Sequence, residues 1–87
     1  MPRRLSQEDK DWAKAVKRRD GRRCQMPGCG RKGKLEAHHI TRYADSHHLR
    51  LEIDNGITLC KSCHYEIRNR EHHYASLFND IVSEKRK

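Results

Sequence analysis

Few residues in the N-terminal quarter of the chain are hydrophobic, and those present fall at helical spacing around Trp12. This spacing predicts a helix with one narrow apolar face and a basic opposite face. Ser6 and Asp9 have the separation of a capping box at the start of that helix, and Gly21 is a suitable stop. We therefore expect a basic arm and a helix within residues 1–23.

The middle of the chain carries short alternating patterns. Apolar and polar residues alternate over 35–40 and again over 57–60, which predicts two short strands. Between them, 54–56 reads Asp-Asn-Gly, a strong turn signal. A similar alternation over 49–54 predicts a further strand or extended segment.

Helical spacing returns towards the C-terminus. Residues 61 to about 69 predict a helix in which Tyr65 and Ile67 pack inward, and 70–87 predict a second helix with a frayed, charged tail. The expected core face of that last helix consists of Tyr74, Leu77, Phe78 and Ile81. Because no linker or repeat divides the chain, we expect one α+β domain whose central part spans 24–69.

Composition limits how such a domain can be stabilised. Hydrophobic residues make up 33% of the chain and charged residues 37%, so the core is thin and needs a staple such as disulfides or a structural metal. The N-terminus lacks the apolar run of a signal peptide, and no stretch is long enough to cross a membrane. We therefore expect a reducing cytoplasm, where cysteine pairs more often hold metal than each other.

Basic residues outnumber acidic ones, giving a formal charge of +8. An excess of this size on a small domain favours a polyanionic partner, most often nucleic acid, over a surface that is merely well solvated. The sequence does not single out one basic residue in the first predicted helix and the segment after it. The candidates for phosphate contacts there are Lys17, Arg18, Arg19, Arg22 and Arg23.

The four cysteines form two pairs. Cys24 and Cys29 flank a tight turn containing Pro and Gly, and Cys60 and Cys63 have the two-residue gap that lets two thiolates bind one zinc. Four thiolates around Zn(II) leave no open coordination position, so the predicted role is structural. Two disulfides or a redox-active pair are the alternatives, and neither explains how so polar a chain folds in a reducing compartment.

The chain has seven histidines, mostly in clusters. His38 and His39 are adjacent on a predicted strand and must point to opposite faces. One can therefore bind a metal while the other acts as a base near physiological pH. The pairs at 47–48 and 72–73 have no partner at a recognised spacing, and we interpret them as surface residues.

Two further residues complete a candidate site for phosphodiester cleavage. The carbonyl oxygen of Asn55 could hold the ring of the base in the required tautomer. His64, in the first turn of a predicted helix, could bring a second ligand to the metal. Each residue also has a simpler interpretation: Asn55 as part of a hairpin turn and His64 as a surface histidine.

At this point the chain resembles the HNH endonucleases. The resemblance lies in three motifs in the same order, at 37–40, 55–60 and 63–64, and the cysteine pairs resemble the zinc-stapled branch of that family. It covers roughly Cys24 to Asn69. It implies the ββα-metal fold, in which two short antiparallel strands and a helix hold one catalytic divalent ion, here with a helix on either side.

The resemblance also implies roles for single residues. His39 takes the position of the general base, and Asn55 that of the residue that orients it. His38 and His64 take the positions of metal ligands. Toxin nucleases of the family have a further metal-binding histidine where this chain has Arg68, which could clamp a phosphate instead. Two neutral protein ligands suit a loosely held Mg(II) or Mn(II), and imidazole also accepts Ni(II), Co(II) or Zn(II).

The expected function is therefore a metal-dependent DNA endonuclease that leaves 5′-phosphate and 3′-hydroxyl ends. The alternative is a zinc-stabilised nucleic-acid-binding module, which would have no need of the four-residue set. Without a recognisable base-reading helix, DNA binding should be nonspecific. No small-molecule cofactor is expected. Similarity to small stand-alone members from phages and prophages implies DNA-packaging proteins as candidate partners.

Overall fold

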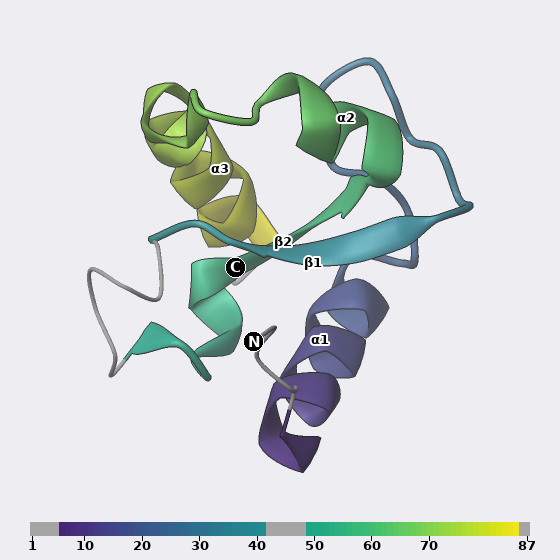
Figure 1. The fold of residues 1–87 in the computed structure, drawn as a ribbon, viewed down its shortest axis with the longest axis vertical. Helices are drawn as coiled ribbons and strands as arrows, with labels where there is room; N and C mark the ends of the chain where they lie inside the picture. Colours follow the sequence, from purple (N-terminus) through teal and green to yellow (C-terminus); the bar gives the residue numbers. More distant parts are fainter. Residues whose placement is uncertain (1–5, 42–48, 86–87) are drawn as a thin grey trace.

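A two-stranded sheet lies at the centre of the computed structural model, which describes residues 6–41 and 49–85. Strands β1 and β2 pair antiparallel, with α1 against one face of the sheet and α2 and α3 against the other (Figure 1). The elements are α1 (Gln7–Arg19), β1 (Leu35–His39), the 3-10 helix η2 (Ile53–Asn55), β2 (Gly56–Cys60), α2 (Lys61–Glu66) and α3 (Glu71–Lys85). The predicted α+β class is confirmed.

Helix α1 begins and ends as its sequence predicts. The Ser6 side chain accepts the backbone N–H of Asp9 at 3.1 Å, and the Asp9 carboxylate accepts the N–H of Ser6 at 3.2 Å, which completes the capping box. Past the end of the helix, Gly21 has φ +67°, a left-handed conformation that glycine adopts without strain. Leu5, which the pattern placed on the same apolar face, lies outside the described residues.

Helix α1 approaches β2 closely at Gly56. A Cβ atom on Gly56 would lie 2.5 Å from Trp12 Cζ2 and 2.6 Å from Val16 Cγ2, so the contact depends on the missing side chain. Trp12 also donates its indole N–H to the carbonyl of Glu52 at 2.8 Å. The helix is therefore fixed both to the strand and to the segment that leads into it.

A buried carboxylate provides a second attachment. Asp20, just after α1, accepts the backbone N–H of Thr58 at 2.9 Å and the Nε–H and Nη2–H groups of Arg19, each at 2.9 Å. Arg19 also donates to the carbonyls of Ile53 and Gly56. These donors of Arg19 therefore serve the protein's own backbone and carboxylate, which argues against the expected phosphate contact.

The main core lies on the opposite face of the sheet. Ile57 and Leu59 of β2 are fully buried there, together with Ile67 after α2 and Phe78 and Val82 of α3. Cross-strand register places His38 opposite Ile57, so His38 shares this face. The sheet thus separates two sets of packed side chains, one under α1 and one under α2 and α3.

The predicted strand over 49–54 does not form. Backbone hydrogen bonds there are local: Glu52 N–H donates to the carbonyl of Leu49 at 3.2 Å, and Asn55 N–H to that of Glu52 at 3.0 Å. These bonds span three residues and wind the chain into 3-10 turns. The alternation was misleading because no strand of the described chain pairs with this segment, and Ile53 is 44% exposed.

The predictions that Tyr65 and Leu77 face the core were wrong. Helix α2 ends at Glu66, earlier than the predicted limit near 69, and Ile67 alone turns into the core. Tyr65 is 70% exposed because the short helix presents it to solvent. On α3, Leu77 is 38% exposed, and Val82 takes a core position instead.

Replacing Gly56 by alanine should destabilise the fold, because the new methyl group must displace Trp12 or Val16. We expect the free energy of unfolding to fall by about 1–3 kcal/mol, measured by urea denaturation of the zinc-loaded protein. The matched control is Gly33→Ala, since a Cβ atom on Gly33 meets nothing within 4 Å. Equal stability of the two variants would show that α1 does not pack against β2 in this way.

Candidate metal centres and active site

The four cysteine thiols converge on one point. Among the described residues they form the group whose ligand atoms all lie within 4.8 Å of one another, and all four thiols are free. Cys29 Sγ lies 3.8 Å from Cys60 Sγ, the separation of about 3.8 Å expected for two ligands of tetrahedral zinc at 2.3 Å. The donor set fits structural Zn(II), as predicted.

Local backbone contacts hold the two pairs in place. In the turn that carries the first pair, Cys24 N–H donates to the carbonyl of Arg31 at 2.8 Å, and Gln25 N–H ties the turn to β2 through Thr58 at 2.9 Å. The second pair lies where β2 ends and α2 begins. There Cys60 caps the helix, and its sulfur accepts the N–H of Cys63 at 3.5 Å.

Without a cation these thiols resist ionising together. Burial raises the pKa of Cys24 and of Cys63 above the ordinary value. The backbone N–H of Cys63 has the opposite effect on Cys60 and lowers its pKa to about 7. A divalent metal supplies the positive charge that the buried thiolates lack, so its loss should destabilise this end of the protein.

His38 and His64 meet on the main-core face of the sheet. Their rings lie edge to face with centroids 5.2 Å apart, and Phe78 covers His38 from α3. His38 is buried, and no partner within the described residues bonds its Nε2 atom. Burial first, then the neighbouring His64, lowers the pKa of His38 to about 4. The ring is therefore neutral at pH 7 and keeps a lone pair that a metal can use.

Glu36 joins this pair, although the sequence patterns did not indicate it. A carboxylate oxygen of Glu36 contacts Nδ1 of His64. Glu36 lies two residues before His38 on β1, so both point to the same face. Period-two spacing could have revealed Glu36 beside His38, but its contact with His64 requires the fold. A cavity of about 230 Å³ lies here, lined by Glu36, Lys61, His64, Tyr65 and Arg68.

His39 points to the opposite face, as the strand pattern predicts. Its ring stacks on Trp12 with centroids 4.0 Å apart and planes inclined by 7°. Its Nε2 atom lies 2.9 Å from the carbonyl oxygen of Arg50. Because a carbonyl can only accept, Nε2 carries the proton and Nδ1 keeps the lone pair of the neutral ring.

Asn55 holds the chain around this site rather than the ring itself. Its carbonyl oxygen accepts the N–H of Thr41 at 2.8 Å, and its amide donates to the carbonyls of Thr41 and Leu49 at 3.1 and 3.2 Å. These bonds join the residues on either side of 42–48. The expected hydrogen bond from Asn55 to His39 is therefore not made, and the Arg50 carbonyl serves instead.

A family model for HNH endonucleases matches residues 24–70, more than half of the chain. This protein belongs to the HNH endonuclease family. The matched segment contains both cysteine pairs, His38, His39, His64 and Asn55, and it leaves out α1 and the whole of α3. Searches of curated proteins and of solved structures found no match. Membership indicates nuclease activity and a DNA substrate.

The remaining predicted contact residues of this HNH protein lie on separate elements. Arg68 is exposed, lines the cavity beside His64 and has its guanidinium 5.9 Å from the centre of the Tyr65 ring. Lys17 lies on α1, and Arg22 and Arg23 are exposed in the segment that follows it. No helix in the described part of the chain is both long and apolar enough to cross a membrane.

Cys60→Ser should lower both zinc content and stability of this HNH protein, because a neutral hydroxyl replaces a buried thiolate ligand. We expect one zinc per chain in the wild type and less than one in the variant, measured by native mass spectrometry, with a lower Tm. His64→Ala serves as the control and should keep its zinc. Wild-type protein that lacks zinc and shows no cobalt–thiolate absorption after substitution would rule out the four-cysteine site.

Proposed function

We propose that this chain is a metal-dependent DNA endonuclease whose catalytic groups are His38, His39 and His64. The observation that carries the proposal is the buried, unpartnered Nε2 atom of His38 beside the ring of His64. An unsatisfied polar atom at such a depth costs about 1–3 kcal/mol, which a ligand to that atom would relieve. Two imidazoles together offer the donors that a divalent cation needs.

His38 and His64 would hold that cation. When bound, it supplies positive charge against the phosphoryl oxygens and the leaving 3′ oxygen. Two neutral imidazole ligands leave room for water and phosphate, which suits Mg(II) or Mn(II), while Ni(II), Co(II) and Zn(II) also accept imidazole. The contact between Glu36 and Nδ1 of His64 supports a positioning role for Glu36, because it leaves Nε2 of His64 with the lone pair.

His39 is the general base. The Nε2–H group of His39 donates a hydrogen bond to the Arg50 carbonyl, so Nδ1 is the atom that accepts a proton from water. The water oxygen then attacks phosphorus, the bond to the 3′ oxygen breaks, and that oxygen leaves and takes up a proton. The products carry 5′-phosphate and 3′-hydroxyl ends. Trp12 limits rotation of the His39 ring, since the two rings are stacked.

Basic side chains hold the substrate. Arg68 lines the same cavity as His64, which supports a contact from Arg68 to the scissile or a neighbouring phosphate. Lys17, Arg22 and Arg23 contribute contacts from the α1 side, and the net charge of +8 attracts the polyanion. Each phosphate neutralised should steepen the dependence of log affinity on log salt by about 0.9.

His39→Ala should reduce plasmid cleavage by about 10²–10⁴-fold, because the water loses its base. Cleavage is measured with Mg(II), Mn(II) or Ni(II), and zinc content and DNA affinity should stay unchanged. His39→Gln preserves much of the side-chain bulk against Trp12 and separates chemistry from packing. The matched control is His73→Ala, an exposed histidine on α3. If wild type and both His39 variants cleave equally, His39 is not the base; if none cleaves, the chain is a binding module.

Glu36→Ala should weaken both cleavage and catalytic-metal binding by about 10–100-fold, because the ring of His64 loses the group that orients it. Glu36→Gln should recover most of both, since its amide oxygen still accepts from Nδ1. Mn(II) affinity is measured by electron paramagnetic resonance on zinc-loaded protein, independently of cleavage. Glu8→Ala, an exposed acid on α1, is the control. Unchanged Mn(II) affinity in Glu36→Ala would exclude this role.

A further inference from the structure

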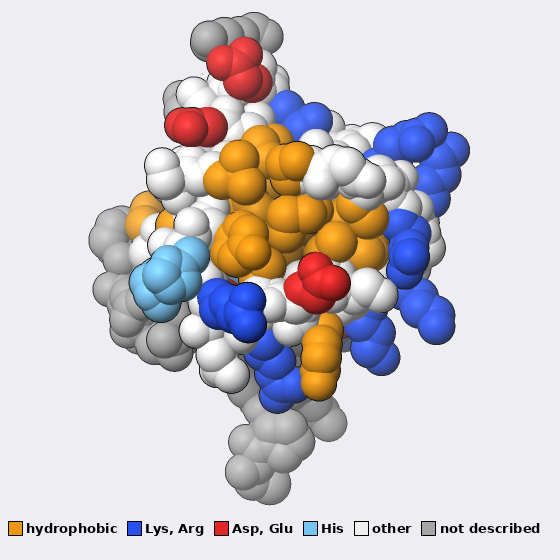
Figure 2. Space-filling model, turned by 90° about the horizontal axis from the view of Figure 1, so that it is seen from above, with side chains coloured by type: hydrophobic (Ala, Val, Ile, Leu, Met, Phe, Trp, Pro, Cys, Tyr) orange, Lys and Arg blue, Asp and Glu red, His pale blue; other side chains and the backbone are white. Residues whose placement is uncertain are grey.

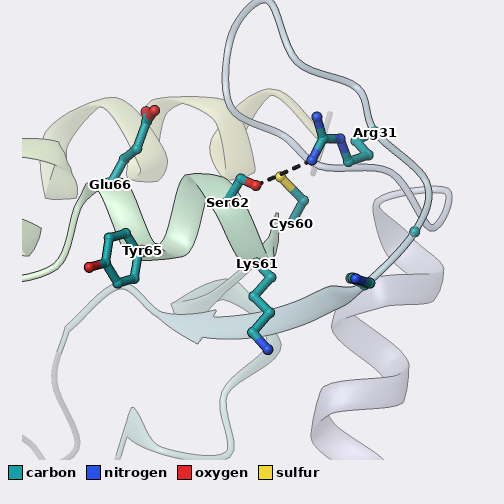
Figure 3. Close-up of a pocket in the computed structure, with 8 residues that line it drawn as sticks. Arg31, Cys60, Lys61, Ser62, Tyr65 and Glu66 are labelled. Atoms are coloured by element: carbon teal, nitrogen blue, oxygen red, sulfur yellow. Dashed lines mark hydrogen bonds between the residues drawn. The ribbon is translucent and has the colours of Figure 1, made fainter.

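A second cavity, of about 720 Å³, lies between α2 and the loop that follows the first cysteine pair (Figure 3). Neither His38 nor His39 lines this cavity, and it has no part in the proposed chemistry. Its walls are formed by Arg31, Gly33, Lys34, Cys60, Lys61, Ser62, Tyr65 and Glu66. Cys60 places it next to the zinc site, so its walls come from a part of the chain that the metal should hold rigid.

The cavity is electropositive. Arg31, Lys34 and Lys61 are exposed, and no ion pair among the described residues involves any of them. One acid, Glu66, lies in the same lining. Arg31 donates to the Ser62 hydroxyl at 3.2 Å, which holds its guanidinium across the cavity (Figure 3). Three such cations around one hollow favour an anionic ligand such as successive phosphates.

Tyr65 gives this surface an aromatic component. It is 70% exposed and contributes nothing to the core, and the Arg68 guanidinium lies 5.9 Å from the centre of its ring. Lys61 and Tyr65 are four residues apart on α2 and project from the same side of the helix (Figure 3). An exposed ring beside cations is the arrangement that binds single-stranded nucleic acid, with bases stacked on rings and phosphates on cations.

The two cavities share a wall. Lys61 and Tyr65 line the cavity beside Arg31 and Lys34, and they also line the one beside His64 and Arg68. A strand with one phosphate at His64 can therefore continue past Tyr65 without leaving the basic surface. Lys and Arg side chains follow the edge of the face that carries α2 and α3 (Figure 2).

We propose that this surface binds a single-stranded DNA segment adjoining the cleavage point. Arg31, Lys34 and Lys61 contact its phosphates, and an unpaired base stacks on Tyr65. In continuous duplex the faces of each base are covered by neighbouring pairs, so Tyr65 gains a partner at an overhang, gap or flap. The preferred substrate is thus DNA with an unpaired segment next to the scissile phosphate. That the segment lies next to the scissile phosphate rests on the proposed function.

The test is a binding measurement that needs no cleavage. Zinc-loaded protein is titrated by fluorescence anisotropy, without added catalytic metal, into a blunt duplex and into a duplex with a single-stranded overhang of equal phosphate number. We expect tighter binding of the overhang. Tyr65→Ala should weaken overhang binding by about 5–100-fold and leave blunt-duplex binding within about twofold. Tyr65→Phe, which keeps the ring, should behave as wild type.

Charge variants test the phosphate contacts. Lys34→Ala should flatten the salt dependence of overhang binding by about 0.7, the slope that one phosphate contributes on a single strand. The matched control is Lys10→Ala, an exposed lysine on α1, which should leave this slope unchanged. Equal affinity for the two duplexes, or equal weakening of both by Tyr65→Ala, would overturn the proposal. The proposal would also be overturned if a polyglutamate peptide displaced the overhang duplex equally well from wild type and from Tyr65→Ala, because the ring would then add nothing to DNA binding. If the protein cleaves no DNA but still prefers the overhang, only the proposed nuclease activity is overturned.

Discussion

The rest of the structure depends on the joining of four thiols from two distant segments. Cys29 and Cys60 are 31 positions apart, yet their sulfurs lie 3.8 Å from each other. A core as thin as this one cannot supply that closure by burial alone. Because Cys60 both ends β2 and caps α2, the cluster determines where the helix begins. The place of His64 against His38 follows from that start.

The two-stranded sheet gives the adjacent residues His38 and His39 different surroundings. His38 turns towards α2 and α3, where burial keeps its ring neutral, and His39 turns towards α1, where Trp12 and the Arg50 carbonyl restrain it. A strand is the element that sends neighbours to opposite faces. A helix would have separated the same two side chains by only about 100° around its axis.

The features that the sequence predicted depend on residues close together in the chain or on ligand chemistry, whereas the features that it missed depend on contacts between distant segments. The capping box of Ser6, the strands around His38 and Ile57, and the cysteine cluster follow from spacing within one segment or from ligand chemistry. The roles of Arg19, Asn55 and Glu36 depend on backbone or side-chain atoms more than ten residues away. Spacing does not carry that information. The 3-10 turns at 49–55 were missed for the same reason, since alternation implies a strand only where a neighbour pairs with it.

The stack of Trp12 on His39 crosses the boundary of the family segment. The HNH match begins at Cys24, whereas Trp12 belongs to the helix before it. The orientation of the proposed base is therefore set partly by a residue that the shared motif does not include. Such a motif can be inherited intact while the helix beside it changes, so relatives with identical histidines can differ in how firmly that ring is held. The set of residues that fixes the proposed base therefore extends beyond the segment that the family shares.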